Sequence, residues 1–354
     1  MNGLPNKKLI QSIYSPPLLD SPRTDDPSQV LETIYRGVQR QTFSLARHAL
    51  KTGLSALGLK AGDRVLIPSF ICRDVLAPFH VLGIEVLFYS LGEDLLIDES
   101  IEKLPKAEAI MAVHYFGLET DLTPFRKYCG LHGAFLIEDN AHGFLSESQS
   151  GPLGTHGDIG IVSLRKSLPI LNGALLLADK KVNLPPSLPV QILKSTRLQV
   201  KNILRPLVSR FGVGFLLKLT QFKRSLRYLI KGSLVPTSDK EDEHHIPFAP
   251  NSIDVRSYIF QMDLEKEKKR RRDLFEAFSK LLSDPSVRPL RCQLTPFEVP
   301  YVFPFFCSKE NIDRIERLIR SAGTEVVHWP ALPEAVEGHE PEFYNNLYLV
   351  KFLW

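Results

Sequence analysis

Short apolar runs alternate with amphipathic stretches from residue 44 to residue 177, and this alternation constrains the fold more than any other feature of the chain. Repeated strand–helix units of this kind build a mainly parallel sheet with helices packed on it. Helical spacing predicts helices over residues 42–59 and 122–133, ending near Gly58 and Gly133. Strands are predicted over residues 63–70, 85–91, 107–116, 134–139, 158–164 and 173–179. We therefore expect an α/β fold in this half of the chain.

The last third of the chain follows another pattern. Charged residues with helical spacing predict a long helix over residues 257–284, and residues 309–323 predict a second, amphipathic helix. Short apolar runs over 299–307 and 324–330 predict strands. A chain of 354 residues is long enough for two domains. We predict a large α/β domain over residues 1–245 and a smaller α+β domain over residues 246–354.

A basic segment separates these two patterns. Twelve Lys and Arg residues occur between residues 180 and 231, where no acidic residue is found. Helical apolar spacing predicts one or two amphipathic helices there, so residues 180–245 are interpreted as a basic helical insertion followed by an exposed linker. The insertion either covers the large domain with its cations hydrated or makes weak, salt-sensitive contact with anionic lipid. The adjacent His244 and His245 are interpreted as solvated linker residues, and no metal site is expected.

Charge and cysteine content limit the possible functions. The chain has 44 basic and 40 acidic residues, and a net charge of +4 is too small to predict a nucleic-acid-binding protein. Its four cysteines lie far apart, which argues against a disulfide framework and favours a reducing compartment. No secretory signal is recognised at the N-terminus. A cytoplasmic location is therefore the expectation.

Two residues at predicted strand ends can perform chemistry. Asp139 ends the apolar strand in LIEDNAHGF, and ligands of open α/β sheets bind at the carboxyl ends of strands. Lys166 lies two residues after the strand DIGIVSL, at its end, and a neutral lysine amine there can attack a carbonyl to form a Schiff base. A lysine for the aldehyde and a carboxylate for the ring nitrogen are the pair that pyridoxal phosphate requires. His114 also ends a predicted strand, where it serves either the site or the structure.

Because it has both Asp139 and Lys166 at strand ends, the sequence resembles the fold type I pyridoxal-phosphate enzymes, and more closely the DegT and StrS type sugar aminotransferases. Five blocks carry the resemblance, in family order: ALGLKAGDRVLIPSF, AVHYFG, LIEDNAH, GTHGDIGIVSLRK and NGALLL. It is strong from about residue 43 to residue 179 and weak in the C-terminal domain. The resemblance implies a fold type I large domain that binds the cofactor, with a small C-terminal domain.

The resemblance also implies roles for individual residues. Lys166 matches the lysine that carries the cofactor, and Asp139 matches the carboxylate at the ring nitrogen. His142 matches a residue near the phenolic oxygen, and Ser163 matches a serine at the phosphate. Two positions depart from the family pattern. The phosphate-binding helix starts with Ala46-Arg47 instead of the usual Gly-Thr or Gly-Ser, and the cation of Arg47 would substitute there. Cys72 occupies the position where an aromatic ring usually stacks on the cofactor.

The leading interpretation is a pyridoxal-phosphate-dependent aminotransferase acting on a keto-sugar, which we expect to be nucleotide-linked. The resemblance implies glutamate or glutamine as amino donor and a homodimer. Two alternatives stay open. One is a pyridoxal-phosphate-dependent dehydratase, against which the retained lysine argues. The other is a degenerate, non-catalytic binding protein, which the altered phosphate helix and the missing stacking ring favour.

Overall fold

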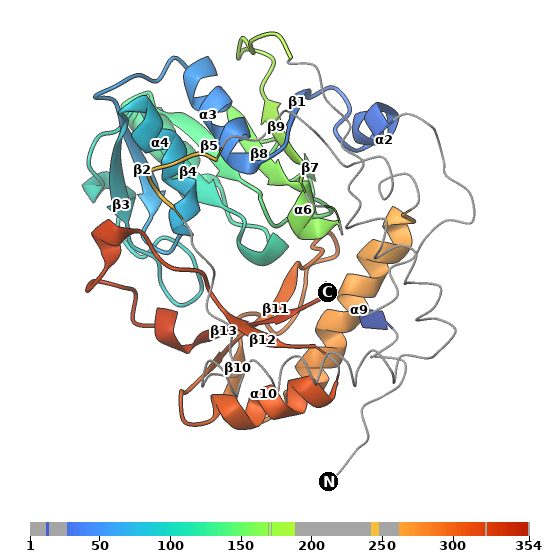
Figure 1. Cartoon of the computed structure of the whole chain (residues 1–354). Coiled ribbons are helices and arrows are strands. Elements are labelled where there is room, and N and C mark those ends of the chain that lie inside the picture. Colours follow the sequence, from blue (N-terminus) through green and yellow to red (C-terminus); the bar gives the residue numbers. More distant parts are fainter. Residues whose placement is uncertain are drawn as a thin grey trace.

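The computed structural model describes residues 12–13, 27–168, 170, 172–187, 242–247, 262–322 and 324–352. Its largest element is a seven-stranded sheet with the order β1-β9-β8-β5-β4-β2-β3 (Figure 1). The strands of this sheet are β1 (Gln39–Phe43), β2 (Arg64–Pro68), β3 (Glu85–Tyr89), β4 (Ala109–Val113), β5 (Phe135–Asp139), β8 (Ile159–Ser163) and β9 (Ala174–Ala178). The six strands predicted from the sequence are thus present, and β1 is an additional one.

Five of the seven strands are parallel to one another, from β8 through β5, β4 and β2 to β3. The other two, β9 and β1, pair antiparallel. The connection from β8 to β9 explains this change, because a parallel crossover needs a dozen or more residues and only residues 164–173 lie between them. The connection contains the single-turn helix α6 (Leu164–Ser167). The predicted mainly parallel α/β fold is confirmed.

Helices cover the large sheet. Helix α3 (Ala46–Ala56) packs on β1, β8 and β9, whereas α5 (Thr123–His132) packs on β4 and β5. Gly58 and Gly133 follow these helices with φ of 79° and 67°, the left-handed conformation that glycine adopts without steric cost. The helix predicted from residue 42 begins only at Ala46, because residues 39–43 form the edge strand β1. The smaller helices here are α2 (Pro27–Ile34), α4 (Ala77–Leu82) and the 3₁₀ turns η1 (Arg73–Val75), η2 (Ile101–Lys103) and η3 (Tyr115–Gly117).

The C-terminal part forms a four-stranded antiparallel sheet with the order β10-β11-β13-β12. It combines this sheet with two helices, in agreement with the predicted α+β pattern. Its elements are α9 (Leu264–Leu281), β10 (Val287–Pro289), β11 (Val302–Cys307), α10 (Ile312–Ser321), β12 (Val326–His328), η5 (Glu334–Val336), η6 (Tyr344–Asn346) and β13 (Leu347–Lys351). A two-stranded ribbon, β6 (Glu147–Ser148) and β7 (Gly151–Pro152), lies outside both sheets.

One hydrophobic cluster spans both sheets, and a second one lies on the C-terminal sheet. Trp329, Leu332 and Phe343 of the C-terminal part are buried in the same cluster as the strands of the large sheet. The division of the chain at residues 245 and 246 stays a prediction. The predicted helices of the basic insertion lie outside the described residues, apart from residues 180–187.

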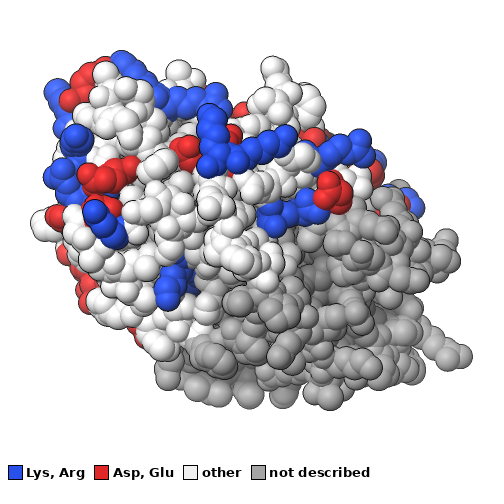
Figure 2. Space-filling view, turned by 90° about the horizontal axis from the view of Figure 1, so that it is seen from above, with Lys and Arg blue, Asp and Glu red and all other residues white. Residues whose placement is uncertain are grey.

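Figure 2 shows the molecule from above, with basic and acidic side chains interspersed over the described part of this face. Among the described residues, no helix is both long enough and apolar enough to cross a membrane.

Candidate active site

A pocket opens at the carboxyl ends of the parallel strands, and it is lined by the last residues of three of them, Val113 of β4, Asp139 of β5 and Ser163 of β8. Its empty volume is about 890 Å³, including the part open to solvent. Parallel strands direct their carboxyl ends to the same sheet edge, so residues distant in sequence meet there. The pocket is lined by all six residues that the sequence predicted: Arg47, Cys72, Asp139, His142, Ser163 and Lys166.

Asp139 is a buried carboxylate at this edge. Its side chain is 5% exposed, and its Oδ1 accepts a hydrogen bond of 2.9 Å from the backbone N–H of Ala141. Burial raises the pKa of Asp139, while the nearby Lys166 charge and the Ala141 bond act in the opposite direction. A positively charged group next to this buried carboxylate would stabilise its ionised form.

Lys166 lies in α6, directly after β8, and its Nζ is 3.0 Å from Nε2 of His142. The other ring nitrogen of His142, Nδ1, accepts a 3.2 Å hydrogen bond from the backbone N–H of Phe116. Neutral imidazole carries one proton, so with Nδ1 as acceptor this proton is on Nε2. Nε2–H then donates to the lysine amine, which accepts with its lone pair. The arrangement fits the nucleophilic, uncharged form of the amine.

The His142 ring is held by aromatic side chains. Tyr301 lies parallel to it at 5.1 Å between ring centroids, Phe116 lies parallel at 6.0 Å, and Trp329 meets it edge-on at 5.8 Å. Burial holds the pKa of His142 well below its usual value, and a positive charge on Lys166, whenever the amine is protonated, lowers this pKa further. His142 therefore stays neutral, which agrees with its hydrogen-bonding pattern.

Phe116 has an unusual backbone conformation, with a φ of 61°. This left-handed conformation is costly for a bulky residue and persists only when the surroundings hold it. Its N–H donates to His142, and its carbonyl accepts a 2.7 Å bond from the N–H of Tyr301. The strained residue thus connects the histidine to the C-terminal part of the chain.

The N-terminus of α3 contributes positive charge to the pocket. Its N-cap residue is Leu45, which offers no side-chain cap, and Leu45, Ala46 and Arg47 all line the pocket. Uncapped N–H groups at a helix N-terminus favour anions. Arg47 forms an ion pair with Asp74 of η1, with 3.1 Å between Nη1 and Oδ1. Cys72, just before η1, contributes a half-buried thiol to the wall.

Glu138, the residue before Asp139, belongs to a separate network. It is fully buried and accepts hydrogen bonds from Nε2 of His114 at 2.8 Å and from three backbone N–H groups, those of Gly154, His156 and Gly157. Burial raises the pKa of Glu138, but the bond from His114 and the nearby positive charge outweigh this effect and lower it overall. The structure therefore favours the structural interpretation of His114.

The loop that carries Lys166 is anchored from helix α9. Arg271 is 1% exposed and donates to the carbonyl of Ser167, next to Lys166. Its charge is matched by Glu267, which is fully buried and also pairs with Arg270. Sequence reasoning missed Arg271, Tyr301 and Trp329. Their only sequence signals were helical charge spacing and aromatic runs in a region that resembles the family weakly.

Comparison with known proteins agrees with this geometry. Residues 35–174 match the DegT/DnrJ/EryC1/StrS aminotransferase family. The match covers less than half of the chain, and over this segment the chain is similar to that family. Proteins of the family use pyridoxal phosphate. The matched segment contains every predicted site residue, so the resemblance inferred from the sequence is confirmed.

Individual relatives give the same result. Over 136 residues the chain is 32% identical to "GDP-perosamine synthase" of Vibrio cholerae, covering 37% of each protein. Over 123 residues it is 31% identical to "Putative L-glutamine:3-amino-2,3-dideoxy-scyllo-inosose aminotransferase" of Streptomyces kanamyceticus, covering 34% of this chain and 29% of the relative. The chain thus matches about a third of the length of these curated relatives.

A solved structure is similar in fold over the whole chain. The crystal structure of an aminotransferase, TlmJ from Streptoalloteichus hindustanus, superposes with a TM-score of 0.61, covering 100% of this chain and 91% of that one. Its sequence identity is 18%. This similarity confirms the fold type I architecture, including the small C-terminal sheet.

Proposed function

We propose that this chain is a pyridoxal-phosphate-dependent aminotransferase that transfers an amino group from an amino acid to a keto-sugar. The observation that carries the proposal is the meeting of Lys166, His142 and Asp139 in one pocket at the strand ends, with 3.0 Å between the lysine Nζ and the histidine Nε2. The names of the relatives support a sugar or cyclitol substrate.

The side chains of the pocket fit the cofactor. It presents an aldehyde, a basic ring nitrogen, a phenolic oxygen and a phosphate, and each has a chemically matched partner here. A further donor is Trp329, which lines the pocket and has a buried indole Nε1 without a partner among the described residues. A buried N–H of this kind gains from a ligand that accepts its hydrogen bond. The proposed partners are Lys166 for the aldehyde, Asp139 for the ring nitrogen, His142 for the phenolic oxygen, and Ser163 with Arg47 and the α3 N-terminus for the phosphate.

When bound, pyridoxal phosphate supplies an aldehyde for covalent attachment and a ring that accepts electrons. The Nζ of Lys166 would hold the cofactor at its aldehyde, and the lysine amine would be the group of the site that accepts and returns a proton. The carboxylate of Asp139 holds a proton on the ring nitrogen. His142 keeps its proton on Nε2, where it orients the lysine amine. Trp329 and Tyr115 narrow the pocket and limit access of water.

The amino donor is proposed to be glutamate or glutamine, and the acceptor a nucleotide-linked keto-sugar. The name of the Streptomyces kanamyceticus relative supports glutamine as donor. Arg165 is exposed and lines the pocket, so its guanidinium is available to an anionic group of the substrate. A homodimer and a cytoplasmic location remain part of this proposal.

Two alternatives compete with it. The Arg47–Asp74 ion pair at the proposed phosphate site, together with Cys72 in place of a stacking ring, favours a binding protein without catalysis. A dehydratase would use the same pocket, but the lysine that the proposal requires argues against it.

Absorbance spectroscopy of the full chain with added pyridoxal phosphate tests the function. We expect a visible band that borohydride fixes on Lys166, and a loss of this band when glutamate or glutamine is added. Lys166→Ala should lose the borohydride-stable label, with Arg165→Ala as the matched control that retains it. A label on another lysine overturns the assignment of Lys166. A band unchanged by any amino donor overturns transamination.

A further inference from the structure

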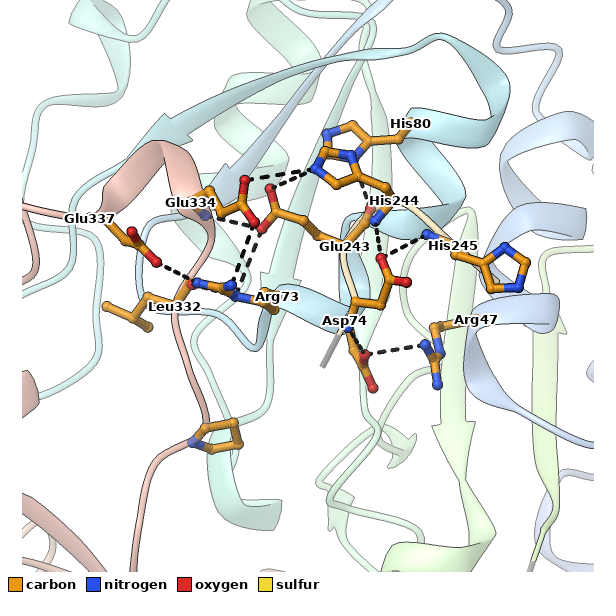
Figure 3. Close-up of polar contacts among 12 residues, drawn as sticks. Arg47, Arg73, Asp74, His80, Glu243, His244, His245, Leu332, Glu334 and Glu337 are labelled. Carbon is orange, nitrogen blue, oxygen red and sulfur yellow. Dashed lines mark hydrogen bonds and ion pairs between the residues drawn. The ribbon is translucent and has the colours of Figure 1, made fainter. Parts of the chain in front are cut away.

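A cluster of histidine and glutamate side chains lies outside the pocket, next to Arg73 of η1 (Figure 3). It joins three segments that are far apart in the sequence. His80 comes from α4, Glu243 and His244 come from the short described stretch 242–247, and Glu334 comes from η5 of the C-terminal part. The candidate ligand atoms of His80, Glu243 and His244 all lie within 4.8 Å of one another.

The two histidines are oriented by the protein. Their rings are stacked, with 4.8 Å between centroids and 16° between planes. Nδ1 of His80 lies 2.7 Å from the backbone carbonyl of Glu243, so this nitrogen carries the proton and donates it. The proton on Nδ1 leaves the lone pair on Nε2. Histidines that bind metals typically have this arrangement, because a carbonyl at one ring nitrogen fixes the other as a ligand.

Carboxylate oxygens face the second histidine. Nε2 of His244 lies 3.9 Å from Oε1 of Glu243 and 3.8 Å from Oε2 of Glu334 (Figure 3). These distances exceed a hydrogen bond, so the imidazole of His244 is not joined to either carboxylate by a short bond. The Glu243 side chain is 5% exposed, and its Oε2 accepts a 3.0 Å bond from the N–H of Glu334. The carboxylate is thereby held in place.

The charges of the cluster do not balance. Three carboxylates, those of Glu243, Glu334 and Glu337, surround the single guanidinium of Arg73. The short bonds of Arg73 go to the carbonyl of Leu332, at 2.9 and 2.8 Å, and to Glu337 at 2.6 Å. Its distances to Glu243 and Glu334 are 3.9 and 3.6 Å. Two carboxylates therefore have charge that Arg73 does not match through a short bond, and a dication would match it.

We propose that His80, His244 and Glu243, with Glu334 as a fourth ligand, form a binding site for one divalent transition-metal ion of the Zn²⁺ class. Two imidazole nitrogens with carboxylate oxygens suit Zn²⁺, which prefers four ligands, whereas Mg²⁺ and Ca²⁺ prefer all-oxygen sites. The ligand pair of histidines is thus His80 and His244, and the neighbouring His245 is not part of it. This revises the expectation of a merely solvated histidine pair.

Such an ion would link the stretch 242–247 to both α4 and η5. The stretch also reaches the pocket wall, because the N–H of Asp242 donates a 3.2 Å bond to Oδ1 of Asp74, the partner of Arg47. The metal would therefore stabilise the wall that carries Arg47. The inference stands independently of the proposed enzymatic function, because it rests on residues outside the pocket.

Metal binding to the full chain tests the proposal. After treatment with a chelator, the protein is dialysed against buffered Zn²⁺ and the bound metal is measured, and Co²⁺ absorption reports the ligand geometry. We expect about one tightly bound ion per chain. His80→Ala and His244→Ala should each weaken this site by at least about tenfold, because each removes a ligand and even supporting groups cost that much. His245→Ala is the matched control and should bind as the unchanged protein does.

A further variant guards against a folding effect, since His80 also bonds the backbone of Glu243. Glu334→Gln keeps the shape of the side chain and removes only its charge, and it should weaken Zn²⁺ binding while the melting temperature in chelator stays the same. If Zn²⁺ binds equally well to His80→Ala, His244→Ala and Glu334→Gln, or if the unchanged protein binds none, the proposal is overturned.

Discussion

Glu138 and Asp139 are consecutive buried carboxylates of β5, but their surroundings differ. Neighbouring residues of a strand point to opposite faces, so one lies in the pocket and the other in the network around His114. Glu138 accepts four hydrogen bonds, and its pKa is lowered. Asp139 accepts one from Ala141, and its pKa is raised by burial.

This difference separates a structural carboxylate from a functional one. A buried charge is expensive unless hydrogen bonds and opposite charge compensate it. Glu138 is compensated within the protein, so its charge stabilises the loop of Gly154 and His156. Asp139 is compensated only in part, so a cation brought by a ligand would complete its surroundings. Substitution of the two residues should therefore affect different properties.

The largest effect is expected for Asp139→Asn. An amide cannot hold a proton on a ring nitrogen as a carboxylate does, and loss of a positioned acid–base group costs about 10²–10⁴ in rate. We expect the reaction of the bound cofactor with glutamate to slow by about this factor, with no loss in the free energy of unfolding. Stopped-flow absorbance and urea unfolding measure the two quantities. A variant with normal turnover would contradict the proposed role of Asp139.

For Glu138→Gln the expected loss is in stability. Its Oε2 accepts hydrogen bonds from the His114 ring and from the backbone N–H of Gly154. An amide NH₂ at the position of Oε2 is itself a donor, so it could accept neither bond. An uncompensated buried group of this kind costs about 2–4 kcal/mol of unfolding free energy. Urea unfolding measures it. The control is Glu108→Gln, where a less buried carboxylate accepts one bond from the N–H of Arg64 and the cost should stay below about 1 kcal/mol. If Glu138→Gln and Glu108→Gln lose the same unfolding free energy, the hydrogen-bond network of Glu138 has no special role in stability.

The pH dependence of stability should differ in sign between the two residues. A lowered folded pKa means that Glu138 stabilises the fold above its unfolded pKa of about 4.3 and loses this contribution as the pH falls. A raised folded pKa means that Asp139 lowers stability as the pH rises above its unfolded pKa of about 3.9. Relative to the unchanged protein, Glu138→Gln should therefore lose more stability at pH 7 than near pH 4. Asp139→Asn should instead gain stability relative to the unchanged protein as the pH rises from 4 to 7. Thermal unfolding at several pH values measures this, and parallel curves for both variants would contradict it.

The sequence was sufficient to predict much of this site, because its features are local. Asp139 ends one apolar strand and Lys166 comes shortly after another, and parallel strands bring such ends to one edge. The strand β1, QRQTF, was not predicted because its polar residues carry no strand signal on the edge of a sheet. The short helix α4 was missed because one and a half turns give too few residues for a period to emerge.

Other parts depended on long-range packing. The sequence gives no indication that Glu138 differs from Asp139, since both end the same apolar run and only the three-dimensional structure brings His114 to one of them. Tyr301 and Trp329 lie far from the family blocks, and their contact with His142 requires the C-terminal sheet to pack on the large one. The meeting of His80 with His244 likewise joins segments that no local pattern relates.

The smallest effect is expected at Tyr301, which tests whether the pocket depends on the orientation of its histidine. The Tyr301 ring is parallel to His142 within 1°, and such contacts are worth about 0.5–1.5 kcal/mol. Tyr301→Leu removes the ring and should lower kcat by about 2- to 10-fold, because His142 then holds the lysine amine less firmly. Tyr301→Phe keeps the ring and should restore most of kcat.

A merely structural role of Tyr301 would lower the melting temperature and leave the pH profile of kcat unchanged. We expect instead that the profile shifts in Tyr301→Leu alone, because the ring contributes to the burial that keeps His142 neutral; an unshifted profile would assign Tyr301 to packing only.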